Sequence, residues 1–94
     1  MHIDATEYYK LTTLLRNADI PYQTVLHTYA MGNDYQICIP SVSFWQQRKG
    51  INIAINALTY GHEKGLLELW DGKGNPNGYL TAEEAFEKIK EMGW

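Results

Sequence analysis

The sequence has little of what secreted, membrane-spanning or disulfide-rich proteins depend on. Its 94 residues include a single cysteine, Cys38, so no intramolecular disulfide can form. No apolar run approaches the ~18 residues that a membrane-spanning helix needs. The segment Met1 to Glu7 has neither a basic region nor an apolar stretch, so we expect no signal peptide. These absences predict a cytoplasmic protein with no membrane partner.

Acidic residues are missing from a long central stretch. None lies between Asp34 and Glu63, where the only charges are Arg48 and Lys49, although the whole chain has a net charge of −3. The hydrophobic fraction of 45% and the small net charge exclude a disordered chain. The length predicts a single domain over residues 1–94. The middle of this domain is therefore locally basic.

Motifs with a clear catalytic or metal-binding spacing are also missing. The histidines His2, His27 and His62 are far apart, and there is no HExxH, P-loop or GxGxxG pattern. Cys38 alternates with Ile37 and Ile39, as expected of a buried strand residue. We expect no cofactor, no metal and no enzymatic activity. A small hydrolase or nuclease using His27, His62 and Glu68 stays open, because spatial proximity is not visible in a sequence.

One segment resembles a calcium-binding loop. Residues 73–84 place Asn75, Asn77 and Glu84 at ligand positions of an EF-hand pattern. The first position, which needs an acidic ligand, is Lys73. Glu84 is also explained by the capping box that it forms with Thr81. We therefore expect no calcium site here.

Two helices are predicted at the ends of the chain. Asp4 and Glu7 match a capping box, and an apolar stripe from Tyr8 to Ala18 continues until Pro21 ends the helix. The second capping box, at Thr81, begins an apolar stripe that stops at Gly93. The apolar side of each helix is therefore expected to pack against an apolar surface of the protein.

Four strands are predicted between these helices. They span residues 22–29, 35–39, 51–55 and 66–70, with a turn at 31–34, a connection at 41–50 that has room for one helical turn, and a loop at 71–78. The fold class is α+β, in the order αββββα. Two hairpins form a four-stranded antiparallel sheet, and the N- and C-terminal helices pack on one of its faces.

The other face of this sheet is predicted to be polar. Alternation places on it some of Gln36, Cys38, Asn52, Asn56 and Glu68, together with large aromatic side chains. Such a face suits a ligand or a second copy of the chain. A solvated face with no partner explains the same pattern equally well.

Aromatic and basic residues in two loops predict a site for a small anionic ligand. The segment 44–50 combines aromatic planes, amides and two cations. An aromatic ring stacks on a base, an amide reads a base edge, and cations neutralise phosphate. The candidate ligand-binding residues are Trp45, Gln47, Arg48, Lys49, Tyr60, His62, Lys64 and Tyr29. Two adjacent cations on an acidic protein form a poor track for extended nucleic acid.

The stretch YGHEKGLLELW, followed by GYLTAEEAFEKIKEMG, resembles small phage and prophage proteins of Gram-positive bacteria. The resemblance implies an accessory protein in the cytoplasm of an infected host cell. Such proteins inhibit host defence by sequestering a nucleotide second messenger or by blocking a host protein. We therefore expect a non-enzymatic homo-oligomer that sequesters a small nucleotide-like ligand. The alternative is a protein–protein inhibitor of a host factor.

Overall fold

Alternating isoleucines build the centre of the sheet. In the computed structural model, which describes residues 2–94, strand β3 (Ile51–Ile55) buries its three isoleucines on one face. β3 pairs with β2 (Gly32–Ile39) on one side and with β4 (Leu67–Trp70) on the other. The outer strands are β1 (Gln23–Tyr29) and β5 (Asn77–Leu80). All neighbours are antiparallel, in the order β1-β2-β3-β4-β5.

The sheet therefore has five strands, so the predicted four-stranded sheet and the order αββββα are wrong. The observed order is αββαβββα, with a 3-10 turn between the third and fourth strands. The predicted loop 71–78 overlaps β5, whose Leu80 lies opposite Leu67 of β4. Gly78 explains the error, because glycine usually indicates a break in a strand. Here a Cβ on Gly78 would collide with the Cβ of Tyr60, so glycine permits a close approach of two chain segments.

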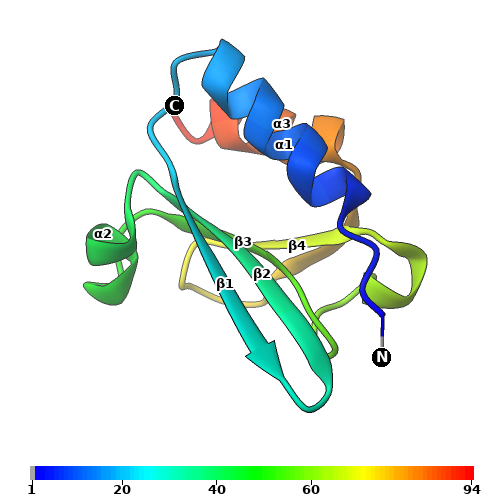
Figure 1. Cartoon of the computed structure of the whole chain (residues 1–94). Helices are drawn as coiled ribbons and strands as arrows, with labels where there is room; N and C mark the ends of the chain where they lie inside the picture. The colour runs from blue at the N-terminus through cyan, green and yellow to red at the C-terminus, as the bar shows by residue number, and fades with distance from the viewer. Residues whose placement is uncertain (1) are drawn as a thin grey trace.

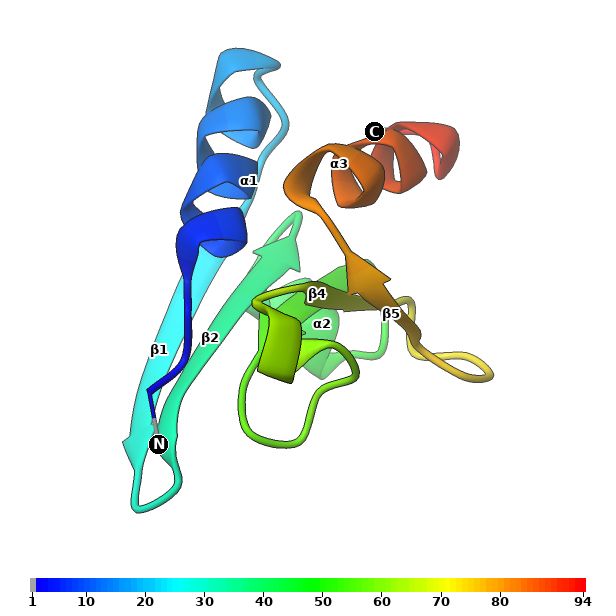
Figure 2. The ribbon, with the colours of Figure 1, turned by 90° about the vertical axis from the view of Figure 1, so that its right-hand side faces the viewer.

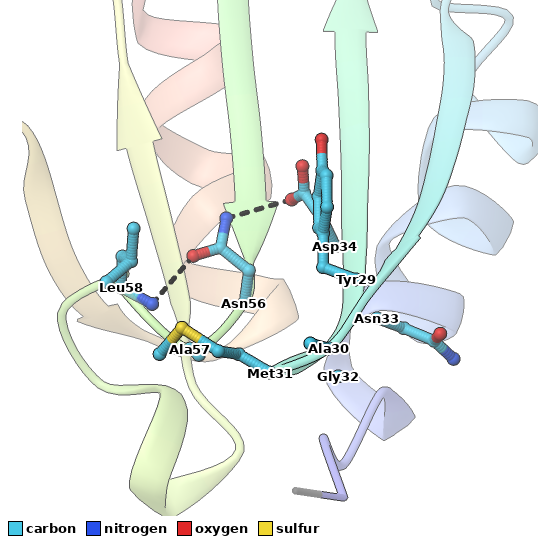
Figure 3. A pocket seen from close by; sticks show the side chains of 9 residues that line it. All are labelled: Tyr29, Ala30, Met31, Gly32, Asn33, Asp34, Asn56, Ala57 and Leu58. Carbon is cyan, nitrogen blue, oxygen red and sulfur yellow. Dashed lines mark hydrogen bonds between the residues drawn. The ribbon is translucent and has the colours of Figure 1, made fainter.

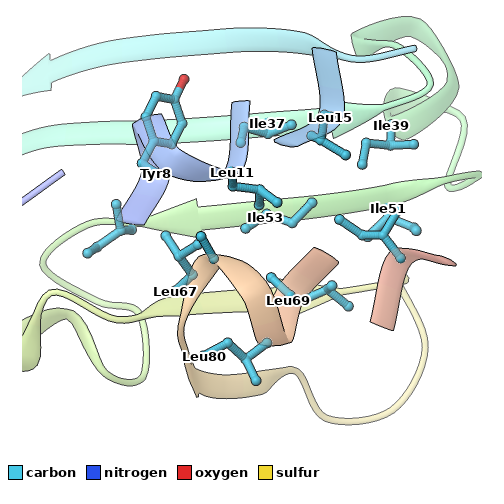
Figure 4. Packing of buried hydrophobic residues seen from close by; sticks show 14 of the residues in the cluster. Tyr8, Leu11, Leu15, Ile37, Ile39, Ile51, Ile53, Leu67, Leu69 and Leu80 are labelled. Atoms are coloured by element: carbon cyan, nitrogen blue, oxygen red, sulfur yellow. The ribbon is translucent and has the colours of Figure 1, made fainter. Parts of the chain in front are cut away.

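Two helices cover one face of the sheet, as predicted. Helix α1 (Thr6–Asn17) and helix α3 (Ala82–Glu91) contact each other and lie above the same face in Figures 1 and 2. Their buried side chains meet the strand side chains of that face (Figure 4). The core includes Tyr8, Leu11, Leu15, Ile37, Ile39, Ile51, Ile53, Ile55, Leu67, Leu69, Leu80, Ala82, Ala85 and Ile89.

The two predicted capping boxes have different outcomes. Thr81 and Glu84 form a complete capping box at the start of α3. Helix α1 has no side-chain cap, and Asp4 accepts hydrogen bonds from the N–H and hydroxyl of Thr6 instead. Glu7 extends to the other helix, where its carboxylate accepts the backbone N–H of Ala82 at 2.8 Å. Glu7 thus caps α3 and ties the first helix to the last.

Short helical turns stand at opposite ends of the sheet. Helix α2 (Val42–Gln46) lies in the connection between β2 and β3, where one turn was expected. The 3-10 turn η1 (His62–Lys64) lies in the connection between β3 and β4. The β1–β2 turn is Ala30–Met31 rather than 31–34, and it lies at the η1 end because the start of β2 pairs with the end of β3. Within residues 2–94, no helix has the length and apolarity needed to cross a bilayer.

Candidate functional site

The face of the sheet opposite α1 and α3 carries polar side chains, as predicted. Strand alternation relative to the buried isoleucines and leucines places there the side chains of Asp34, Gln36, Cys38, Asn52, Asn56 and Glu68. β1 adds Gln23, Val25, His27 and Tyr29 to the same face. Neither long helix covers these groups.

Four of these side chains form one hydrogen-bonded network across β2 and β3. Asn56 Nδ2 donates to Asp34 Oδ1 at 2.8 Å, and Gln36 Nε2 donates to Asp34 Oδ2 at 2.6 Å. Asn52 Nδ2 in turn donates to Gln36 Oε1 at 3.0 Å. Asp34 itself is only 6% exposed. We call Asp34, Gln36, Asn52 and Asn56 the polar network; its members fix one another's orientation.

A pocket of about 560 Å³ opens at one end of this network. It lies between the β1–β2 turn and the chain that follows β3, and Figure 3 shows Asp34 and Asn56 hydrogen-bonded to each other at its edge. Tyr29, Met31 and Leu58 supply apolar surface and are 59%, 57% and 83% exposed. The remaining lining residues are Ala30, Gly32, Asn33 and Ala57. We call this the β-turn pocket.

The β-turn pocket presents an anionic acceptor and no cation. Its lining includes Asp34 and no lysine, arginine or histidine. A carboxylate has about four acceptor sites, and the two amide donors of the network use two of them. Asp34 therefore has capacity for further donors from a ligand. With Tyr29 at the rim, the pocket suits a planar group that carries N–H donors.

The predicted site residues divide between the two ends of the sheet. Tyr29 lines the β-turn pocket, and Tyr60, His62 and Lys64 lie in the connection at the same end. The second group, Trp45, Gln47, Arg48 and Lys49, lies at the α2 end. β3 separates the two ends, and its five residues span about 17 Å. Within one chain the eight residues do not form one site.

At the α2 end, much of the predicted machinery has a structural role. The ring of Trp45 packs edge-on against Trp70 with centroids 5.7 Å apart. Gln47 Nε2 donates to Ser43 Oγ at 3.3 Å. Arg48 has φ 61° and donates its backbone N–H to Trp45 O, so it ends α2 in the left-handed conformation. The side chains of Arg48 and Lys49 are exposed.

At the η1 end, hydrogen bonds fix the loop. Glu68 accepts the backbone N–H of Tyr60 at 2.9 Å. His62 Nδ1 lies 2.7 Å from Thr59 O, and because a carbonyl only accepts, this nitrogen carries the proton. Lys64 Nζ lies 5.9 Å from the ring centroid of Tyr79. His62 and Lys64 line a hollow with His2 and Asp4 that shares no residue with the β-turn pocket.

Two residues of the alternative hydrolase hypothesis, His27 and Glu68, lie on strands that are not neighbours in the sheet. His27 lies on β1 and Glu68 on β4, three strand spacings or about 14 Å apart. His62 is hydrogen-bonded in its own loop. Burial raises the pKa of the Cys38 thiol. Residues 2–94 contain no group of three or more His, Cys, Asp or Glu side chains placed to hold a metal ion.

Sequence reasoning missed Asp34, Met31 and Leu58. Asp34 was assigned to a turn, where aspartate is common. It lies two residues before Gln36, so extending the same alternation would have placed both side chains on one face. Met31 and Leu58 are loop residues that meet only because the β1–β2 turn and the end of β3 lie side by side. No local sequence signal marks that contact.

No protein-family model, curated protein or solved structure matches this chain. The resemblance to phage proteins therefore stays a prediction.

Proposed function

We propose that the chain is a non-enzymatic binding protein that sequesters a small nucleotide-like ligand in the β-turn pocket. The observation that carries the proposal is Asp34, a buried carboxylate held by two amides at the edge of an open pocket. The ligand's base lies on the ring of Tyr29 and donates to Asp34. Its phosphate points away from the carboxylate, toward solvent, because like charges repel.

The donor pattern favours guanine among the common bases. Guanine presents two adjacent N–H donors on its Watson–Crick edge, which match the two oxygens of a carboxylate. Adenine presents one amino group there. A bidentate pair of this kind discriminates by about 1–3 kcal/mol. Guanosine monophosphate should therefore bind roughly ten-fold or more tightly than adenosine monophosphate.

Calorimetric titration with guanosine, adenosine and cytidine monophosphates tests the proposal. Asp34→Asn should weaken guanosine monophosphate binding roughly ten- to hundred-fold, because one acceptor oxygen becomes a donor. Asp71→Asn is the matched control, since Asp71 is exposed and lies in the β4–β5 loop. The ligand should be recovered chemically unchanged after long incubation. Absence of heat with all three nucleotides at millimolar concentration would overturn the proposal.

A second variant covers the case in which Asp34→Asn fails to fold. Tyr29→Ala removes a ring that is 59% exposed, so little stability is lost with it. Loss of base stacking should weaken binding by about 1–3 kcal/mol. Tyr79→Ala is its control, because Tyr79 is 50% exposed and lies on β5, away from the pocket. Equal effects of the two tyrosine variants would contradict stacking on Tyr29.

Inhibition of a host protein is the second candidate. The observation that favours it is the exposed apolar rim of Tyr29, Met31 and Leu58, since tyrosine and methionine are enriched at the centres of protein–protein interfaces. In this case nucleotides give no heat. Wild-type protein, but not Tyr29→Ala, should retain one stoichiometric partner from a bacterial lysate. Retention of no protein would remove this candidate.

A further inference from the structure

Strand β1 is an unprotected edge of the sheet. Among residues 2–94 it pairs only with β2, and all but one of its seven residues are exposed. Natural edge strands are usually shielded by charged side chains, proline or a bulge. The segment QTVLHTY has no Asp, Glu, Lys, Arg or Pro, and its pairing with β2 runs without a register shift. An edge of this kind is a template for another strand.

The two-residue turn fixes which backbone groups of β1 are free. Tyr29 and Gly32 flank the turn and form the first hydrogen-bonded pair of the hairpin. Hydrogen-bonded and non-hydrogen-bonded pairs then alternate. The N–H and C=O groups of Tyr29, His27, Val25 and Gln23 therefore point toward β2. Those of Thr24, Leu26 and Thr28 point outward, away from the sheet.

We propose that the outward groups of β1 pair with β1 of a second copy of this chain, antiparallel about a two-fold axis at Leu26. Leu26 then lies opposite the partner's Leu26, and Thr24 lies opposite the partner's Thr28. Each hydrogen-bonded pair exchanges two N–H···O bonds. This is the register that uses all three outward residues. The two five-stranded sheets become one continuous sheet with an isologous interface.

Side chains support a second copy as the occupant. The pairing places two threonines opposite each other, which is a favourable cross-strand pair, and places no two charges together. Leu26 and Tyr9 are 57% and 58% exposed and border a hollow of about 330 Å³ between α1 and β1. The partner's Leu26 is delivered to the rim of this hollow. Apolar side chains left exposed in one chain are thereby covered.

The same register deepens the proposed function, on which this step rests. Tyr29 lies opposite the partner's Gln23 in the dimer. Within each chain Gln23 Oε1 accepts the N–H of Val42 at 2.8 Å, so α2 begins beside Gln23. The partner's segment 41–49 is therefore brought to the β1 side of the β-turn pocket, whose own lining has no cation. The partner's Arg48 and Lys49 become candidate phosphate contacts for a base held at Asp34.

Sedimentation velocity over a wide concentration range tests the dimer directly, without any ligand. The wild-type chain should form dimers. Leu26→Lys should raise the dimer Kd roughly hundred-fold, since it places two like charges at the axis. Tyr79→Lys places a lysine on β5, at the opposite edge of the sheet, where Tyr79 is 50% exposed, and should leave the dimer unchanged. A monomer at millimolar concentration would overturn the proposal.

Hydrogen exchange distinguishes this interface from any other. The amides of Thr24, Leu26 and Thr28 should exchange fast in dilute solution and become protected as dimers form. Leu26→Pro removes one outward N–H without touching the β1–β2 ladder. It should therefore dissociate the dimer and leave Thr24 and Thr28 unprotected, while the β2-facing amides of Val25, His27 and Tyr29 stay protected. A dimer that forms without protection of these three amides uses another surface and refutes the assignment.

Mixing two variants tests the shared pocket separately. Asp34→Asn damages the pocket, and Arg48→Ala with Lys49→Ala removes the cations. If each site uses both chains, half of the dimers in an equal mixture contain one chain of each variant. One of the two sites in each mixed dimer is intact, so about one quarter of all guanosine monophosphate sites should be restored. Dimers that mix without recovery refute the shared site and leave the dimer standing. If the ligand binds neither wild-type nor mixture, the proposed function fails instead.

Discussion

Removing the carboxylate of Glu7 should destabilise the protein far more than its place on the first helix indicates. Its Oε1 accepts the N–H of Ala82, the first residue of α3, at 2.8 Å, and the side chain of Glu7 is only 18% exposed. Ala82 is fully buried. Without Glu7 this N–H loses its acceptor and water reaches it poorly. The contact also holds α1 against α3.

The magnitude follows from the kind of bond. A hydrogen bond to a charged group contributes about 1.5–3 kcal/mol, and an anion at a helix N-terminus adds about 0.3–1 kcal/mol. We expect Glu7→Ala to lower the free energy of unfolding by about 2–3 kcal/mol. Glu7→Gln keeps a neutral acceptor and should lower it by about 1 kcal/mol. For a domain of this size, each kcal/mol shifts Tm by roughly 4–8 °C.

Urea unfolding monitored by circular dichroism measures these differences. Glu83→Ala is the matched control, because Glu83 shares the ion pair with Lys10, at 3.2 Å, and has a side chain 60% exposed. An exposed pair of this kind contributes at most about 1 kcal/mol. If Glu7→Ala costs no more than Glu83→Ala, the carboxylate of Glu7 does not cap α3 and the reasoning fails.

Three other perturbations have outcomes set by the structure. Gly50→Ala should lower the free energy of unfolding by more than about 3 kcal/mol, because a Cβ at this position would collide with the carbonyl of Ile39. Gly74 also has a positive φ but lies in open space, so Gly74→Ala should lower the free energy of unfolding by only about 1–2 kcal/mol in the same urea assay. Burial raises the pKa of Tyr8 to about 12. The stability that its neutral phenol contributes is therefore present below pH 10 and is lost as the pH rises toward 12. In Tyr8→Phe, the free energy of unfolding should not show this decrease between pH 10 and 12. Cys38 is 1% exposed and burial raises its thiol pKa, so a chromogenic disulfide reagent should react with it only at the rate of unfolding, and rapid reaction in native buffer would contradict its burial.

Local pattern was enough for the parts of the fold whose burial is periodic. The isoleucines at 51, 53 and 55 predicted a strand, and this strand is the centre of the sheet. Thr81 and Glu84 predicted the start of α3 because both halves of a capping box lie within one turn. The same pattern at Asp4 and Glu7 failed, since a buried N–H of another helix competes for the Glu7 carboxylate. That competitor lies 75 residues away in the sequence.

The candidate site depended on contacts of the same long-range kind. The first half of β5, residues 77–78, was predicted as loop because Gly78 and Pro76 are local breakers. Pairing of Leu80 with Leu67 nevertheless makes residues 77–80 a strand. The β-turn pocket exists because the β1–β2 turn and residues 56–58 lie side by side. The polar face could be predicted from the alternation of polar and apolar residues along the strands. The contact between two loops at one end of this face could not be predicted, because no local pattern marks it.

Strand length constrains any ligand that uses both predicted groups of residues. Within one chain, a ligand that touches Tyr29 and Arg48 must follow β3 for about 17 Å across the polar network. A mononucleotide is too short for this. The same ligand reaches both kinds of residue when the cations come from a second copy, because antiparallel pairing of β1 brings the α2 end of one chain to the β-turn end of the other. A requirement for both Tyr29 and Arg48 in binding a mononucleotide would therefore itself be a signature of the dimer.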